Sequence, residues 1–234
     1  MKMSLEVRTE SAIALLNKIA QEYEPAVFAN SFGAEDMVLT DLIARHVPGI
    51  GIASLDTGRL HQETYDLMQQ TTEHYGIRIQ VFHPRHDLVE DHLAGHGPNA
   101  FYGSVELRKQ CCNIRKVEPL KRALAGKKAW ITGLRHEQAP TRGDLEVSAF
   151  DEANGLRKFN PLLDWSLDEV WGYIREHNVP YNALHDRGFP SIGCAPCTRA
   201  ITVGEDIRAG RWWWESPATK ECGLHVAAAR KKAA

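Results

Sequence analysis

The chain has 234 residues, 43% of them hydrophobic and 25% charged, with a formal net charge of -2. This composition allows a full core and excludes intrinsic disorder and collagen-like structure, and the charge gives no electrostatic footprint for nucleic acid. No apolar run approaches the ~18–20 residues of a membrane helix, and the first residues lack the apolar region of a signal peptide. We therefore expect a cytoplasmic protein that does not enter a membrane.

Helical and strand patterns alternate in the first part of the chain. An apolar stripe at helical spacing predicts a helix over 5–22, and a short apolar run predicts a buried strand over 26–29. A loop over 30–36 follows. The same reading predicts two further pairs of elements, namely helices over 37–45 and 62–75 and strands over 51–55 and 77–82.

The second part of the chain has weaker patterns. A long helix is predicted over 106–124, although Pro119 must kink or divide it. A strand over 129–132, a helix over 165–176 and a Gly/Pro/Cys-rich loop over 188–199 complete the expected elements. Histidines that lack a metal-ligand spacing are expected to line a loop, and they are His83, His86, His92 and His96.

Strands that alternate with helices indicate an α/β protein with a mostly parallel, twisted sheet flanked by helices. Ligands of such sheets bind beyond the carboxyl ends of the strands. The loops at 30–36, 55–59 and 133–143 follow predicted strands and should meet there. We expect one domain over 1–214 and a mobile C-terminal segment over 215–234.

The first of these loops has features of an anion site. It joins a buried strand to a helix, whose first backbone N–H groups are unpaired, and its glycine lets an anion approach closely. The candidate substrate-binding residues are Ser31, Phe32, Gly33, Ala34, Glu35 and Asp36. No Gly-Lys-Ser/Thr follows, so the loop is not a Walker A motif. An ordinary turn with Asp36 as helix N-cap is the alternative.

A second polar turn follows the next predicted strand and could bind a nucleotide edge or a ribose hydroxyl. Its residues are Leu55, Asp56, Thr57 and Gly58. A plain turn is again the alternative.

The cysteines carry the strongest pattern in the sequence. Two close pairs, Cys111/Cys112 and Cys194/Cys197, suggest one four-thiolate metal centre. Neighbouring helical residues point about 100° apart, which fits a 4Fe-4S cluster better than a single ion, because each thiolate binds a different iron. A zinc site and four unrelated thiols are the alternatives.

Cys222 stands apart, between Lys220 and His225. A thiolate beside cationic groups has a lowered pKa and becomes a usable nucleophile. An inert buried cysteine is the alternative. The Trp212–Trp214 triplet is expected to pack at the edge of an element.

Cations follow the candidate loops and the cysteine pair. Arginine binds phosphate and sulfate oxygens through paired hydrogen bonds, and lysine acts as a point charge. An anionic small ligand would suit this set, which consists of Arg115, Lys116, Arg135, Arg142, Arg208 and Arg211.

Over residues 26–226 the sequence resembles the assimilatory adenylyl-sulfate (APS) reductases, the iron–sulfur branch of the APS/PAPS reductase family. The resemblance rests on the loops and cysteine pairs above, and on the segments Gly133–Arg135, Gly210–Glu215 and Glu221–His225. It implies an adenine-nucleotide α-hydrolase-like fold and a 4Fe-4S cluster on Cys111, Cys112, Cys194 and Cys197.

The resemblance also implies a reaction, the reduction of APS to sulfite and AMP with thioredoxin as electron donor. Cys222 would attack the sulfur of APS, and a thioredoxin thiol would then release sulfite from the Cys–S–SO₃⁻ intermediate. Charge on AMP would be neutralised by cations, and His225 would hold sulfate oxygens or activate Cys222. The cations carried over from the family are Lys116, Arg142, Arg208 and Arg211. A homo-oligomer is also implied.

Three alternatives stay open. A PAPS reductase would use a substrate with an extra 3′-phosphate, although the four cluster cysteines favour APS. An ATP-dependent tRNA-thiolation or adenylyl-transfer enzyme would need the Ser-Gly-Gly-x-Asp-Ser loop, from which Phe32, Ala34 and the missing final serine depart. A zinc-stabilised interaction domain without enzymatic activity is the third.

Overall fold

The computed structural model describes residues 4–138, 143–216 and 220. The α-helices are α1 (Leu5–Glu22), α2 (Ala34–His46), α3 (Gln62–Tyr75), α4 (His86–His96), α5 (Val105–Cys112), α6 (Glu118–Leu124) and α7 (Leu167–His177). The strands are β1 (Ala26–Asn30), β2 (Gly51–Leu55), β3 (Ile79–Phe82), β4 (Ala129–Ile131), β5 (Ser148–Asp151) and β6 (Leu156–Phe159). A π-helical turn spans Asn113–Val117, and short 3-10 turns span Ala100–Tyr102, His136–Gln138, His185–Arg187 and Ala195–Cys197.

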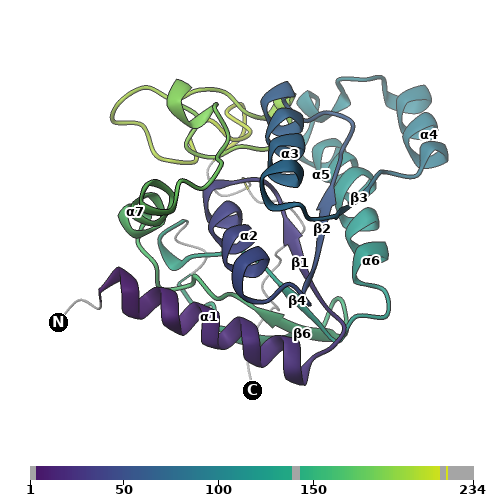
Figure 1. The fold of residues 1–234 in the computed structure, drawn as a ribbon. Helices are drawn as coiled ribbons and strands as arrows, with labels where there is room; N and C mark the ends of the chain where they lie inside the picture. The colour runs from purple at the N-terminus through teal and green to yellow at the C-terminus, as the bar shows by residue number, and fades with distance from the viewer. Residues whose placement is uncertain (1–3, 139–142, 217–219, 221–234) are drawn as a thin grey trace, which may run out of the picture.

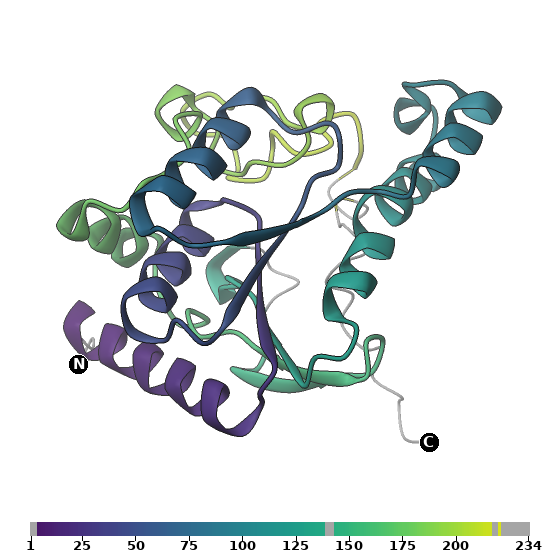
Figure 2. The same ribbon diagram turned by 45° about the vertical axis from the view of Figure 1, so that its right-hand side comes forward.

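The strands form a single six-stranded sheet in the order β3-β2-β1-β4-β6-β5. Neighbouring strands are parallel from β3 through to β6, and β5 pairs antiparallel with β6 at the edge. Figure 2 shows α1, α2 and α7 on one side of the strands and α5 and α6 on the other. The expected mostly parallel sheet with helices on both faces is therefore confirmed.

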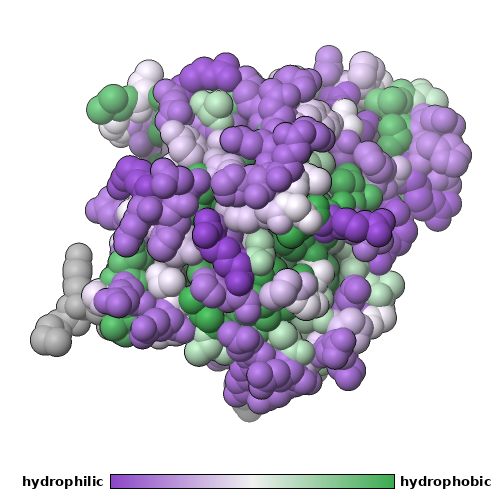
Figure 3. Space-filling model, in the orientation of Figure 1, coloured by the Kyte–Doolittle hydropathy of each residue, from purple (hydrophilic) through white to green (hydrophobic). Residues whose placement is uncertain are grey.

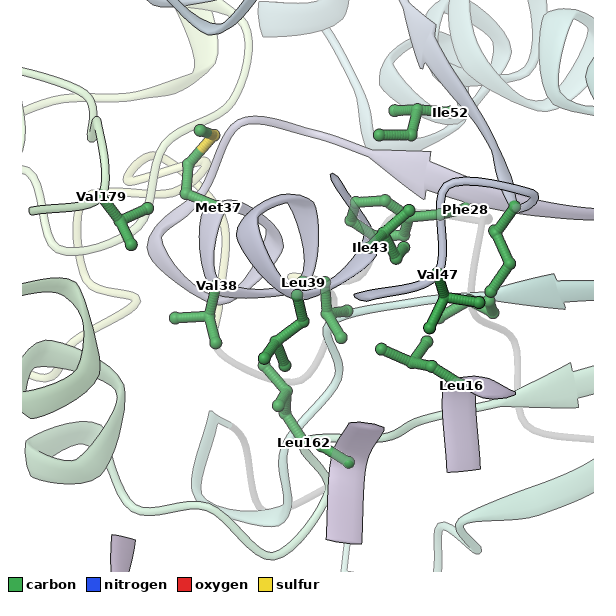
Figure 4. Close-up of a cluster of buried hydrophobic side chains, with 14 of the residues drawn as sticks. Leu16, Phe28, Met37, Val38, Leu39, Ile43, Val47, Ile52, Leu162 and Val179 are labelled. Carbon is green, nitrogen blue, oxygen red and sulfur yellow. The ribbon is translucent and has the colours of Figure 1, made fainter. Parts of the chain in front are cut away.

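The larger part of the core lies between the sheet and the helices α1, α2 and α7. In Figure 4, Met37, Val38, Leu39 and Ile43 of α2 lie among side chains from the strands and from α1, including Leu16. α2 is buried on most sides, and this explains why its sequence shows no simple stripe. A smaller cluster packs α6 against the opposite face of the sheet.

The parallel topology places the carboxyl ends of β1, β2 and β4 at one edge of the sheet. The segment after α7, yellow-green in Figure 1, crosses over this edge. None of the helices in the described part of the chain has the length and apolar character needed to cross a membrane. The face drawn in Figure 3 is mostly hydrophilic, with hydrophobic side chains showing between the elements.

Two helix boundaries differ from the sequence prediction. α2 begins at Ala34 instead of residue 37, with Gly33 as its N-cap, so the reading of Asp36 as N-cap is wrong. The Asp36 carboxylate accepts bonds from the backbone N–H and hydroxyl of Ser31, at 2.7 and 2.6 Å, and so closes the loop from inside the first helical turn. β3 begins two residues after the predicted start at Ile77.

The predicted helix over 106–124 is divided, as the proline suggested. α5 leads into the π-helical turn Asn113–Val117, and α6 then starts with Pro119 in its first turn. Proline is tolerated there because the first N–H groups of a helix have no helical acceptor. Arg115 and Lys116 lie in this turn, directly after the cysteine pair.

The hairpin of β5 and β6 is absent from the sequence prediction. Each strand has four residues, and only Leu156 and Phe159 are buried, so the apolar alternation is too short to recognise. Asn154-Gly155 in the connecting turn, where Gly155 has φ +69°, is the signal that could have revealed it.

The expectation that the histidines line a loop is wrong for three of them. His86, His92 and His96 lie on α4, where the rings of His92 and His96 are 5.3 Å apart. His83 lies before the helix and faces the Asp56 carboxylate, with 3.4 Å between Nδ1 and Oδ2.

Candidate functional site

A cavity of about 260 Å³ opens at the carboxyl ends of β1, β2 and β4. The loop after β1 forms one wall, the segment around residues 190–193 another, and α6 with the apolar strand residues Val27, Ala53 and Trp130 forms the floor. The predicted substrate-binding residues that line it are Ser31, Phe32, Gly33, Ala34, Glu35, Asp36, Leu55, Thr57, Lys116, Arg208 and Arg211. Loops predicted to meet at one sheet edge therefore do meet there, and we call this space the nucleotide pocket, after the ligand that the sequence leads us to expect.

The loop after β1 is held in an uncommon backbone conformation. Phe32 has φ +62° and is buried, and its N–H donates to the Asn30 side chain at 2.6 Å. Asn30 in turn donates to Thr40 of α2 at 2.9 Å. Burial raises the pKa of Asp36 to about 6, although its bonds from Ser31 oppose that shift. The pocket thus contains a carboxyl group whose pKa lies well above its usual value.

Gly133 allows the loops after β1 and β4 to touch. A Cβ at this position would overlap the Asp36 carboxylate and the Glu35 side chain, so only glycine fits. Arg135 follows in the same loop but does not line the pocket. Its buried guanidinium pairs with Glu35 at 2.8 Å and donates to the Trp165 carbonyl at 3.1 Å. Arg135 therefore holds the start of α2.

In the turn after β2, some residues line the pocket and others stabilise the turn itself. Leu55 and Thr57 line the pocket, whereas the Asp56 carboxylate accepts from the Tyr65 hydroxyl and from the Gly58 N–H, both at 2.8 Å. The Thr57 hydroxyl lies 3.2 Å from the Cys194 sulfur. Asp56 and Gly58, both predicted to bind substrate, do not line the pocket and shape a turn that joins it to the cysteines.

Among the residues that the structure describes, the cations that line the pocket are Lys116 from the π-helical turn and Arg208 and Arg211 from the segment after α7. Arg211 donates to the Ser191 hydroxyl at 3.3 Å and to the Ile192 carbonyl at 3.2 Å. Its guanidinium lies so close to Gly193 that a Cβ there would overlap it. Arg208 donates to the Lys220 carbonyl at 2.9 Å.

A second, small cavity collects the four cysteines of the predicted metal centre. Cys111 and Cys112 come from the end of α5, and Cys194 and Cys197 from the loop after α7. The cations that line it in the described part of the chain are Arg59, Arg108, Arg115 and Lys116. Burial raises the pKa of the Cys111 thiol, and burial followed by the nearby Cys194 raises that of Cys197 to about 12. Among the described residues, no group of three or more His, Cys, Asp or Glu side chains is arranged to hold a metal ion.

Arg108 is the most deeply buried cation of this cavity. Burial disfavours its charged form, but hydrogen bonds to Glu215 and Cys112 outweigh this, so the pKa of Arg108 lies above its usual value. Arg115 donates to the Thr57 carbonyl at 2.7 Å and so ties the cysteine helix to the turn after β2. Lys116 lines both cavities. The nucleotide pocket and the cysteines therefore share one wall.

Among the lining residues that sequence reasoning missed, His185 and Trp212 carry groups that can contact a ligand. His185 lines the pocket, and its buried Nε2 has no hydrogen-bond partner among the described residues. Burial lowers the pKa of His185, which favours the neutral ring. Trp212 also lines the pocket, although we expected the tryptophans only to pack at an edge. No local pattern marks His185, whereas the adjacent Arg211 could have drawn attention to Trp212.

Three predicted site residues, Cys222, His225 and Arg142, lie outside the described part of the chain.

Comparisons with known proteins agree with this geometry. The model of the phosphoadenosine phosphosulfate reductase domain matches residues 25–200. The chain is similar to adenosine 5'-phosphosulfate reductase of Allochromatium vinosum, with 58% identity over 95% of this chain and 87% of the relative. The corresponding Burkholderia cepacia protein is 55% identical over 95% of this chain and 89% of its own.

Among solved structures, the fold is similar to a phosphoadenylyl-sulfate reductase from Candida auris in complex with phosphate. The TM-score is 0.70 at 27% identity, and the match covers 86% of this chain and 99% of the other. The family match spans the sheet, the pocket loops after β1, β2 and β4 and all four clustered cysteines. From this match and from the identity to its relatives, the chain belongs to the phosphoadenosine phosphosulfate reductase family.

Proposed function

We propose that this protein reduces adenylyl sulfate to sulfite and AMP, a step of sulfate assimilation, with a thioredoxin-type dithiol as electron donor. The observation that carries the proposal is the wall shared by the nucleotide pocket and the four-cysteine cavity, in which Lys116 lines both. The name that relatives at 48–58% identity bear, adenosine 5'-phosphosulfate reductase, supports the choice of substrate.

The pocket combines the features that a sulfonucleotide requires. Apolar strand residues on its floor, including Val27 and Ala53, suit a flat purine base, and the cations Lys116, Arg208 and Arg211 suit the phosphate and sulfate groups. Paired hydrogen bonds from an arginine would stabilise the charge that develops on AMP as it leaves. Arg142 and His225 are proposed to contribute to the same anionic groups.

The chemistry would take place at Cys222. Its thiolate attacks the sulfur of adenylyl sulfate, an S–S bond forms, and the bond from sulfur to the phosphate oxygen breaks, so that AMP leaves with the electron pair. A thiol of the dithiol donor then attacks the Cys222 sulfur and releases sulfite from the Cys–S–SO₃⁻ intermediate. The second donor thiol resolves the mixed disulfide, which restores the Cys222 thiolate and leaves the donor oxidised. Both electrons come from the donor.

We propose that Cys111, Cys112, Cys194 and Cys197 hold a 4Fe-4S cluster. The donor set fits such a group, because four thiols from two segments, two of them buried and two half-buried, line one cavity beside the cations Arg59, Arg108, Arg115 and Lys116. Those cations would compensate the negative charge of the thiolates. The cluster would supply a rigid cross-link and local charge near Lys116, and this chain's residues would perform every bond change.

Reciprocal variants test both assignments. Anaerobic purification should give a brown protein that contains iron and acid-labile sulfide, whereas a colourless zinc protein would reject the cluster. Cys222→Ser should keep its iron and lose turnover of adenylyl sulfate. Cys197→Ser should lose iron, and equal iron in both variants would contradict the assignment of the cysteines.

Reduction of the 3′-phosphorylated nucleotide is the second candidate. The specific observation in its favour is the likeness to the phosphoadenylyl-sulfate reductase of Candida auris. That likeness is at 27% identity, against 58% for the adenosine 5'-phosphosulfate reductase of Allochromatium vinosum. Steady-state rates with each nucleotide decide between the two, and a higher kcat/KM for the 3′-phosphorylated one would overturn the preferred substrate.

A role for Lys116 follows from its place in both cavities. Lys116→Ala, purified with its full iron content, should lower kcat/KM for adenylyl sulfate because the anionic substrate loses one of its compensating charges. Unchanged kinetics would remove the proposed contribution of Lys116. We also propose a homo-oligomer in the cytoplasm, which sedimentation and cell fractionation test.

A further inference from the structure

A buried ion pair ties the cysteine-bearing helix to the segment after α7. Arg108 of α5 and Glu215 have side chains that are only 1% and 3% exposed. Nε and Nη2 of Arg108 each donate to one Glu215 oxygen at 2.8 Å, and the two residues are 107 positions apart in sequence. Paired bonds of this kind fix orientation as well as distance. Removing either partner would leave the other charge buried and uncompensated.

Trp212 lies beside this pair in a backbone conformation that needs support. Its φ is +40°, a region that a bulky residue rarely adopts, and its side chain is buried. Its N–H donates to the Cys197 carbonyl at 3.1 Å, and its carbonyl accepts from the Glu215 N–H at 2.8 Å. Such a conformation persists only where the surroundings hold it. The Arg108–Glu215 pair is part of those surroundings.

Two guanidinium groups stack on the Trp212 indole. Arg108 lies 4.7 Å and Arg211 4.8 Å from the ring centroid. Arg211 lines the nucleotide pocket, and Arg108 lines the cysteine cavity. A continuous set of contacts therefore runs from the cysteines through Arg108 and Trp212 to Arg211.

We propose that Arg108 and Glu215 are positioning residues that fix Trp212, and through it hold Arg211 at the anion-binding side of the nucleotide pocket. The proposal rests on the proposed function only for the choice of an adenine nucleotide as ligand. It implies that a change in the cysteine cavity alters anion binding through Arg108. This route is separate from Lys116, which lines both cavities directly.

The variants separate positioning from general stability. Glu215→Gln keeps the size of the side chain and removes the charge that orients Arg108. Arg108→Lys keeps the buried positive charge but loses the planar fork and the stacking on Trp212. The matched control is Glu205→Gln. It removes the carboxylate of an exposed ion pair, in which Arg199 and Glu205 are 2.7 Å apart and their side chains are 39% and 31% exposed.

The experiment measures binding of ADP and of adenosine to the purified full-length protein by calorimetry, after its iron content is found unchanged. ADP carries two anionic groups without the reactive sulfate, and adenosine carries none. Glu215→Gln and Arg108→Lys should bind ADP about tenfold more weakly, the effect of losing a charge-assisted contact. Adenosine binding should not change, and Glu205→Gln should behave as the wild type.

Wild-type affinity for ADP in both variants would overturn the proposal, and so would an equal loss for ADP and adenosine, because that indicates general disruption. If Glu215→Gln does not fold, Arg108→Lys decides by the same criterion. Failure of the proposed function would be seen differently, because the wild-type protein would then reduce no sulfonucleotide. The affinities of the variants for ADP and adenosine would still be measurable and would still test the positioning role.

Discussion

Because the Arg211 guanidinium lies against Gly193, we predict that the substitution Gly193→Ala weakens anion binding. A Cβ at this position would overlap the Arg211 guanidinium, which donates to the Ser191 hydroxyl and the Ile192 carbonyl. In Gly193→Ala the guanidinium must leave this place, so the ligand loses a charge-assisted hydrogen bond. Such bonds contribute about 1.5–3 kcal/mol, which corresponds to about a 10- to 150-fold rise in Kd for an anionic nucleotide.

The assay is a titration of the purified protein with AMP and ADP, followed by KM for adenylyl sulfate. Gly95→Ala is the control, because a Cβ on Gly95 meets no atom within 4 Å. Thermal unfolding of Gly193→Ala should stay close to that of the control, since the guanidinium lies at the pocket wall. If Gly193→Ala binds ADP as tightly as the control does, Arg211 has no part in anion binding and the reasoning is refuted.

Three further predictions concern the cavity, a titrating group and a buried pair. Thr57→Val removes the hydroxyl that lies 3.2 Å from the Cys194 sulfur. We expect this variant to lose iron faster in air, and the decay of visible absorption measures the rate. An unchanged rate would count against a role for this contact. Burial raises the pKa of Asp36 from 3.8 to about 6, so the native state binds this proton more tightly than the unfolded state does. The free energy of unfolding should therefore fall by about 3 kcal/mol in total between about pH 3 and pH 7, with about 2 kcal/mol of that between pH 4 and pH 6, and stay lower above pH 7. Denaturant titrations of Asp36→Asn should lack that decline, and identical pH profiles would contradict it. Arg135→Gln should lower the free energy of unfolding by about 3–5 kcal/mol, because it leaves Glu35 without its buried partner, whereas Arg122→Gln, in an exposed helical pair, should cost under about 1 kcal/mol; equal effects would refute the distinction.

The order of the elements and the sheet type could be predicted because β1, β2 and β4 are buried on both faces. Buried parallel strands give continuous apolar runs, and helices with polar faces separate them. β5 and β6 were not predicted, because this edge hairpin buries few side chains and its alternation of apolar and polar residues is short. The start of α2 was placed three residues late because its N-cap is Gly33, which makes no side-chain bond.

The site could be predicted where a loop's position in the topology decides its role. Parallel strands bring their carboxyl ends together, so the loops after β1, β2 and β4 had to meet. The separate roles of neighbouring residues could not be predicted in this way. Asp56 and Arg135 were predicted to bind substrate from their places in the loops, and the loops alone do not reveal that Asp56 bonds Tyr65 or that Arg135 pairs with Glu35. The Arg108–Glu215 pair joins distant segments and leaves no pattern in either one.

The central claim is that the Cys222 sulfur captures the SO₃ group of an activated nucleotide, while the other four cysteines serve a separate purpose. The most direct measurement treats the protein with sulfur-labelled adenylyl sulfate in the absence of a dithiol and maps the label by peptide mass spectrometry. The account predicts label on the peptide that contains Cys222, released as sulfite when a thioredoxin-type dithiol is added. Label on a peptide with Cys111 or Cys194, or turnover by Cys222→Ser at the wild-type rate, would contradict it.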